Sequence, residues 1–225
     1  MIKKIENLQF NGYEATVIIP KNPNGKWIWK TEFLYAFDQA EGALLEKGYT
    51  RVYYRISDKY GSPSAIKLMK EFYHFVVEKF HLDEKCVLFG FSRGGLYAFN
   101  FAVAYPEFVD KVYLDAPVLD LKTWPPKGSV EQGQMFLEYG LNEETLQTFK
   151  GNPIDKLKSF FDLSIPLLIV AGGQDEVVSF DKNAGKLIQY CKDENIDITV
   201  IVKEDGKHHP HSLEEVEPIL GFVIE

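Results

Sequence analysis

Short apolar runs alternate with amphipathic stretches along most of this chain, and the change in apolar spacing separates strands from helices. A hairpin is predicted over residues 8–19, with Asn11-Gly12 at its turn. The further strands are predicted at 26–29, 51–56, 87–89, 111–114, 166–171 and 198–202, and the helices at 33–47, 64–80, 95–104, 143–149, 181–195 and 213–223. A hairpin followed by repeated strand–helix units predicts an α/β fold: a mostly parallel central sheet with helices on both faces.

The 225 residues are predicted to form a single domain, because this length suits one sizeable core. Residues 118–163 break the strand–helix rhythm, with Pro125-Pro126, Gly128, Gly133 and one short helical piece. This stretch is too short and too interrupted for a second domain. It is therefore interpreted as a short helical lid inserted over the carboxyl ends of the strands.

The chain is acidic, with a formal net charge of −8. Nothing in this charge favours nucleic acid or an anionic membrane as a partner. The N-terminus lacks the apolar region of a signal peptide, and no apolar run approaches the length of a membrane span. The sequence therefore predicts a cytoplasmic protein with a small-molecule partner, and its oligomeric state stays open.

A G-x-S-x-G pentapeptide at residues 90–94 directly follows the apolar run at 87–89 and precedes a predicted helix. This is the context of a nucleophile elbow, a strand-to-helix turn so tight that its serine takes strained backbone angles. Ser92 is the predicted nucleophile. The alternative is an ordinary glycine-rich turn with a solvated serine.

A serine nucleophile needs a base and an acid that orients the base. Asp175 follows the predicted strand at 166–171, and His208 follows the last predicted strand, so both lie at the strand edge where Ser92 lies. The order Ser, Asp, His is that of an α/β-hydrolase. Asp115 is kept as an alternative acid and His209 as an alternative base.

Three of the five histidines stand in one loop, at 208, 209 and 211. A metal site is the competing interpretation of this loop, but no nearby carboxylate or cysteine along the chain completes a ligand set. The sequence therefore predicts no metal and no organic cofactor. His74 and His81 lie on or beside a helix at the other edge and are assigned structural roles.

The developing oxyanion of an acyl-transfer reaction needs hydrogen-bond donors. One predicted donor is the backbone N–H of Arg93, at the start of the helix after Ser92. The second is predicted in the turn after the strand at 26–29, from the amide of Trp29 or Lys30.

These residues together make the chain resemble the α/β-hydrolase superfamily over nearly its full length. Within it, the chain is similar to small esterases found beside carbohydrate-degrading enzymes, on the strings at 27–33, 58–63, 90–95, 115–120 and 208–213. The resemblance implies a serine hydrolase with Ser92 as nucleophile, Asp175 as acid and His208 as base. It suggests acyl groups on sugars as substrates.

The sequence analysis thus predicts hydrolysis of a carboxylic ester with a small acyl group, such as acetyl. Tyr60, Asp120, Trp124 and His209 are candidates for the substrate pocket. Tyr60, Trp124 and Tyr139 are considered as an aromatic platform for a sugar, against ordinary packing of the lid. The alternatives are a thioesterase or peptidase with the same triad, and a catalytically silent binding protein.

Overall fold

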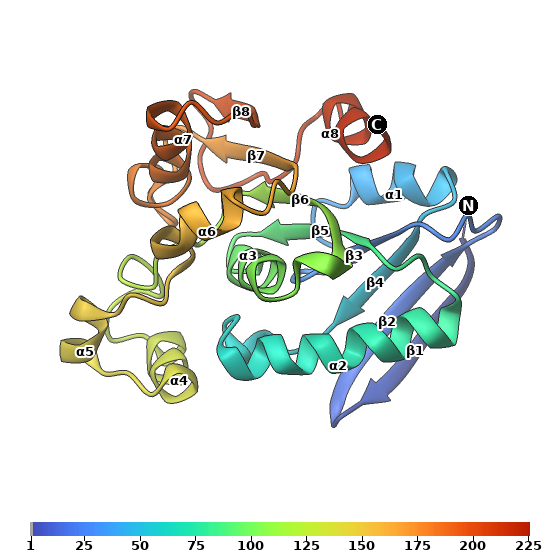
Figure 1. Ribbon diagram of the computed structural model, residues 1–225, viewed down its shortest axis with the longest axis horizontal. Helices are drawn as coiled ribbons and strands as arrows, with labels where there is room; N and C mark the ends of the chain where they lie inside the picture. Colours follow the sequence, from blue (N-terminus) through green and yellow to red (C-terminus); the bar gives the residue numbers. More distant parts are fainter. Residues whose placement is uncertain (1) are drawn as a thin grey trace.

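Eight strands form one twisted sheet in the computed structural model, which describes residues 2–225 (Figure 1). The strand order is β1-β2-β4-β3-β5-β6-β7-β8. Strand β2 pairs antiparallel with β1 and β4, and every other pair is parallel. The predicted fold class is confirmed. The strands are β1 Ile2–Phe10, β2 Tyr13–Pro20, β3 Trp27–Lys30, β4 Thr50–Tyr54, β5 Cys86–Phe91, β6 Val109–Asp115, β7 Leu167–Gly172 and β8 Thr199–Lys203.

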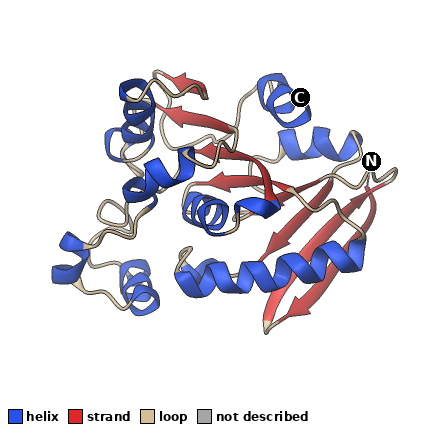
Figure 2. Ribbon diagram, viewed as in Figure 1, coloured by secondary structure: helices blue, strands red, loops and turns tan. Residues whose placement is uncertain are grey.

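Helices cover both faces of the sheet (Figures 1 and 2). They are α1 Gln39–Glu46, α2 Pro63–Phe80, α3 Gly94–Ala104, α4 Val130–Tyr139, α5 Glu143–Thr148, α6 Leu157–Phe161, α7 Ala184–Asp193 and α8 Glu217–Ile224, with short 3-10 turns η1 Ser57–Lys59, η2 Pro106–Phe108, η3 Pro153–Lys156 and η4 Phe180–Lys182. No helix within residues 2–225 combines the length and apolar character needed to span a membrane.

The alternation of side chains along each strand divides the core into two layers. Trp27 and Trp29 point into the larger layer, which is covered by α2, α3, α6 and α7. Ile28, between them, points into the smaller layer, which is covered by α1 and α8. Burial on both faces explains why β3, β5 and β7 are apolar almost throughout.

Three predicted helix boundaries differ from the structure. The helix expected from residue 33 begins only at Gln39, because Phe33 and Phe37 adopt positive φ angles of 56° and 51°, which no helix continues through. The stretch expected at 181–195 divides into η4 and α7, and the last helix begins at Glu217 rather than at residue 213. In each case the apolar spacing extends beyond the helix into the adjoining loop.

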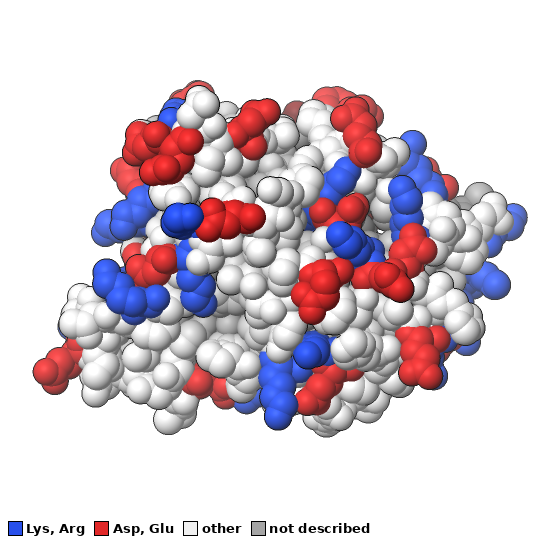
Figure 3. Space-filling view, viewed as in Figure 1, with Lys and Arg blue, Asp and Glu red and all other residues white. Residues whose placement is uncertain are grey.

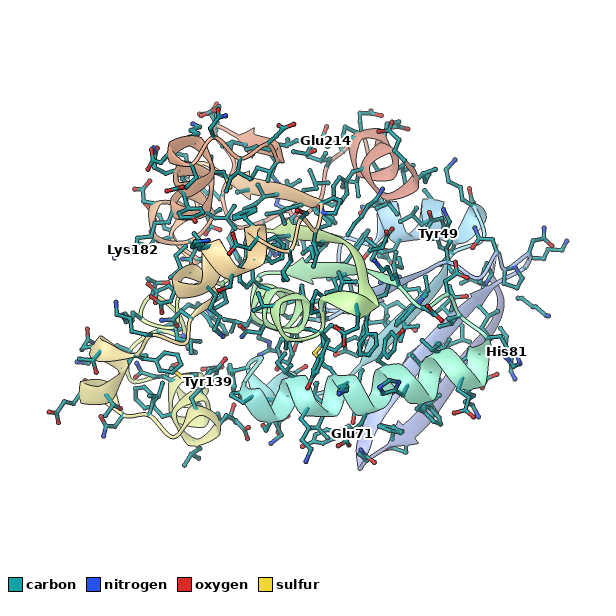
Figure 4. All side chains as sticks on the ribbon, viewed as in Figure 1. Tyr49, Glu71, His81, Tyr139, Lys182 and Glu214 are labelled. Atoms are coloured by element: carbon teal, nitrogen blue, oxygen red, sulfur yellow. The ribbon has the colours of Figure 1, made fainter. Side chains whose placement is uncertain are left out.

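Residues 118–163 carry α4, α5, η3 and α6, and the first two of these helices stand apart from the sheet at one side of the molecule (Figure 1). The Asn183 side-chain oxygen accepts the amides of Leu119 and Asp120 at 2.8 and 3.0 Å, which fixes the start of this segment. Its helix α4 ends at Tyr139 (Figure 4), whose hydroxyl donates to the carbonyl of Tyr60 at 2.8 Å. The segment is thus anchored to the loop that precedes α2.

Candidate active site

Ser92 lies in the tight turn between β5 and α3, with a left-handed φ of 50°. Its amide donates to the Asp115 carbonyl at 2.9 Å, and its carbonyl accepts the amides of Gly95 at 3.0 Å and Val118 at 2.8 Å. A non-glycine residue in this region costs about 1–3 kcal/mol and persists only where its surroundings hold it. One of these backbone bonds closes the turn itself and two fasten it to the end of β6 and the loop after it, which is the support expected for a nucleophile elbow.

Two glycines of the turn are required by close packing. A Cβ on Gly90 would lie 2.8 Å from Cβ of Ala98, and one on Gly95 would lie 2.5 Å from Cβ of Pro117. Real Cβ atoms do not approach other atoms so closely. The glycines therefore let α3 pack directly against the sheet and the loop after β6, which places Ser92 at the carboxyl end of the sheet.

The structure brings Ser92, His208 and Asp175 into one hydrogen-bonded chain. The Ser92 Oγ atom lies 3.0 Å from His208 Nε2, and His208 Nδ1 lies 2.7 Å from Asp175 Oδ2. All three residues are buried, at 8%, 6% and 6% exposure. This arrangement has the geometry in which a histidine can take a serine proton while a carboxylate orients the ring.

The loops that carry the acid and the base are fastened to each other. The Gly173 amide donates to the Lys203 carbonyl at 2.9 Å, and the Gln174 amide donates to the Gly206 carbonyl at 2.8 Å. Asp175 is itself oriented, because its Oδ1 atom accepts the amides of Val177 and Val178, both at 2.9 Å. Its other oxygen is therefore directed at His208.

Of the two candidate bases, only His208 contacts Ser92 and Asp175. His209 is exposed and stacks on Phe37 with ring centres 5.6 Å apart. Partial burial is the main cause that lowers the pKa of His209, and the neighbouring imidazoles of His211 and His208 lower it further. His209 therefore lies beside the hydrogen-bonded chain of Ser92, His208 and Asp175 and is not part of it.

Asp115, the alternative acid, belongs to a second buried aspartate–histidine pair. Its Oδ1 atom accepts from His211 Nδ1 at 2.7 Å, and its Oδ2 atom accepts from the Tyr113 hydroxyl at 2.6 Å and the Ser212 amide at 2.8 Å. Asp115 therefore fastens the histidine loop to the end of β6. An acid after a strand and a third histidine in the loop are both visible in the sequence, but their pairing is not.

The structure corrects the predicted second oxyanion donor. Trp29 and Lys30 do not lie in a turn: both belong to β3, which pairs with β4 and β5 on its two sides. The next amide, of Thr31, donates to the Phe89 carbonyl at 3.0 Å. The strand continues beyond its apolar run because the polar side chain of Lys30 can be buried in an ion pair with Glu41. Burial lowers the pKa of Lys30.

Glu32 is a buried acid that the sequence analysis missed. It is 2% exposed and lies against the start of α3, where its Oε2 atom accepts from Ser57 Oγ at 2.9 Å and from Arg93 Nη2 at 3.4 Å. Its Oε1 atom is buried without a hydrogen-bond partner among the described residues. Burial raises the pKa of Glu32, and the Arg93 charge opposes this shift. An acid two residues after the end of β3 was the available signal.

The predicted aromatic platform is largely closed by packing. Tyr60 is 1% exposed, its hydroxyl donates to Gln134 at 2.7 Å, and its ring centre lies 6.2 Å from that of the half-buried Trp124. Asp120 is also buried and accepts the Lys122 amide at 3.0 Å, so it closes a turn of the lid. Tyr60 therefore offers no open face to a sugar ring, contrary to its place among the pocket candidates.

His74 and His81 lie away from this edge. His74 is exposed on α2, and His81 ends that helix at the side of the molecule opposite the lid (Figure 4). Acidic and basic side chains are interspersed on the face viewed in Figure 3. The net charge of −8 over the whole chain is therefore not gathered into one patch on this face.

The model of the prolyl oligopeptidase family matches residues 46–225. A search of curated proteins gave no match.

Solved structures share the fold at low sequence identity. Acylaminoacyl peptidase from Pyrococcus horikoshii superposes with a TM-score of 0.70 at 15% identity, over 93% of this chain and 38% of its own. A carboxylesterase, Cest-2923 from Lactobacillus plantarum, gives 0.66 at 16% identity, over 92% of this chain and 85% of its own. The fluorophosphonate-binding serine hydrolase F of Staphylococcus aureus gives 0.70 at 14% identity, over 98% and 94%. These likenesses confirm the predicted α/β-hydrolase fold.

Proposed function

Since this chain belongs to the prolyl oligopeptidase family, a family of serine hydrolases, we propose that it hydrolyses a carboxylic ester with a small acyl group. Ser92 is the nucleophile, His208 the general base and Asp175 the residue that orients the base. The observation that carries this proposal is the continuous chain of contacts from Ser92 Oγ to His208 at 3.0 Å and from His208 to Asp175 at 2.7 Å.

In the proposed reaction, Ser92 Oγ attacks the acyl carbon while His208 Nε2 takes the hydroxyl proton. The imidazolium, held by Asp175, then gives this proton to the departing alkoxide. Water repeats the sequence on the acyl-enzyme: His208 takes a proton from water, the acid leaves, and Ser92 regains its proton. The reaction needs no component beyond the ester and water.

Two backbone amides are proposed to stabilise the oxyanion. The Arg93 N–H stands at the start of α3, where the helix dipole favours negative charge. The Glu32 N–H replaces the predicted Trp29 and Lys30 donors, because it is the first amide beyond the sheet and lies beside Gly94. Donors of this kind are worth about 3–4 kcal/mol each to the transition state.

Three observations favour a small acyl group on an ester. Ser92 is only 8% exposed, which favours a compact substrate at its hydroxyl. The lid helices α4 to α6 are short. Two neighbours that this chain covers for most of their length are named as a carboxylesterase and as a fluorophosphonate-binding hydrolase. The resemblance of the sequence to small esterases found beside carbohydrate-degrading enzymes suggests an acetyl ester on a carbohydrate as the substrate.

Peptide hydrolysis is the second candidate, favoured by the family description and by the peptidase from Pyrococcus horikoshii. The Glu32 Oε1 atom, buried without a partner among the described residues and belonging to a side chain that contacts Arg93, is an acceptor that the amine of a short peptide would suit.

Kinetics on matched substrates test the proposal. We expect a higher kcat/KM on p-nitrophenyl acetate than on longer acyl chains or on aminoacyl p-nitroanilides, and loss of turnover in Ser92→Ala. The exposed Ser159 on α6 provides a matched control, since Ser159→Ala should retain turnover. Ester hydrolysis that persists in Ser92→Ala would refute the mechanism, and faster cleavage of anilides would favour the peptidase. Failure of a fluorophosphonate probe to label Ser92 would favour a binding protein.

A further inference from the structure

The three histidines of the loop after β8 form a compact cluster. The ring centres of His208, His209 and His211 lie 4.7, 4.9 and 4.8 Å apart in pairs, with the rings nearly perpendicular. One ring nitrogen of each residue lies within 4.8 Å of those of the other two. Only His208 contacts Ser92, so the proposed reaction leaves the rest of this cluster unexplained.

Two of these rings are held as zinc-binding histidines are held. The Nδ1 atoms of His208 and His211 each face a buried carboxylate at 2.7 Å, that of Asp175 and that of Asp115. A histidine that binds metal typically donates its other ring N–H to such a carboxylate, which fixes its orientation and raises its basicity. The sequence disfavoured metal because no carboxylate or cysteine nearby in the chain completes a ligand set. The fold brings two acids to the cluster from β6 and from the loop after β7.

The ring nitrogens lie farther apart than those around a bound tetrahedral ion. With Zn–N bonds of about 2.0–2.1 Å, the ligating nitrogens of one ion lie about 3.3 Å apart. The cluster must therefore contract by about 1.5 Å from its 4.8 Å spread. His209 can supply its own share of this movement, because it is exposed and is held mainly by stacking on Phe37.

We propose that His208, His209 and His211 bind one Zn²⁺ ion and that the bound ion blocks the hydrolase. Three imidazoles leave a fourth position on the ion, which Ser92 Oγ or water can fill. His208 Nε2 cannot accept a proton from Ser92 while it donates its lone pair to zinc. Mg²⁺ should have no such effect, since it prefers oxygen ligands. The block of turnover rests on the proposed function, whereas binding of the ion does not.

Zinc binding is measured directly by competition with a chromophoric chelator, with the whole chain. We expect one tight site in the wild type and in Ser92→Ala. Loss of the carboxylate partner behind a metal-binding histidine weakens metal binding ~10–100-fold. His209→Asn removes a ligand itself and should weaken zinc binding by at least as much. His74→Asn is the matched control, because His74 is exposed on α2, and it should bind zinc as the wild type does.

Inhibition is measured on p-nitrophenyl acetate, with each variant compared with its own rate in chelator. Zn²⁺ should inhibit the wild type and His74→Asn at the concentration that fills the site, and should inhibit His209→Asn only at concentrations at least about tenfold higher. Equal zinc binding by His209→Asn and the wild type would overturn the site. A filled site with undiminished turnover would overturn the block. Persistent turnover in Ser92→Ala would refute the proposed function but would leave the binding result to stand on its own.

Discussion

Replacing Asp175 by asparagine isolates the orienting role of this side chain, because the shape of the residue is kept. The Oδ1 atom of Asp175 accepts the amides of Val177 and Val178, both at 2.9 Å. In Asp175→Asn the side-chain carbonyl must keep that position, since an NH₂ group there would face two donors. The new NH₂ group then occupies the position of Oδ2, 2.7 Å from His208 Nδ1.

An NH₂ group at that position forces the proton of the imidazole onto Nε2, which then points a proton at Ser92 instead of a lone pair. His208 can no longer take the serine proton. The same change in serine-protease triads lowers kcat by about 10⁴, because the wrong tautomer is held. A factor of 10⁴ corresponds to about 5.4 kcal/mol of transition-state stabilisation. We expect a loss of this size in kcat on p-nitrophenyl acetate, with the melting temperature little changed.

The matched control is Asp115→Asn, because this buried acid also contacts a histidine of the same loop. Its partner is His211, at 2.7 Å, and not the base. We expect Asp115→Asn to lower the free energy of unfolding by about 1–3 kcal/mol, since buried donors lose a charged acceptor, and to keep most of its turnover. Near-wild-type turnover in Asp175→Asn, or a greater loss of turnover in Asp115→Asn, would refute the assignment of the acid.

Two further predictions concern residues beside the elbow. Gly95→Ala should lower the free energy of unfolding by about 1–3 kcal/mol in urea denaturation, because overpacking forces α3 away from Pro117, whose Cβ would lie 2.5 Å from the added methyl group; unchanged stability would contradict this. Glu32→Gln should change the pH dependence of stability. Burial raises the pKa of Glu32 in the folded chain. Its contribution to stability is therefore fully present below the unfolded pKa of about 4.3 and is lost as pH rises through the folded pKa. The stability of Glu32→Gln relative to the wild type should accordingly rise between pH 4 and pH 8, and a fall would mean that attraction to Arg93 outweighs burial.

Much of the fold is determined by local sequence. The alternation along β1 and β2, the apolar runs of the parallel strands and the helical spacing of α2 each follow from which faces an element must bury. The turn around Ser92 is local too, because its glycines stand directly beside the serine and the apolar strand. These features were predicted with boundaries that differ by a few residues, except that β1 begins at Ile2, well before the hairpin predicted from residue 8.

Tertiary structure decided which side chains meet. Three histidines share one short loop, and neighbouring strands end in Asp115 and in the loop of Asp175, so the sequence allowed several pairings. Hydrogen bonds between the loops after β7 and β8 select His208 for Asp175, while the end of β6 takes His211. The same edge brings Glu32 to Arg93, and two carboxylates to the histidine cluster. Such contacts depend on strand order and on the angle between loops, and a sequence pattern, which records only neighbours along the chain, contains neither.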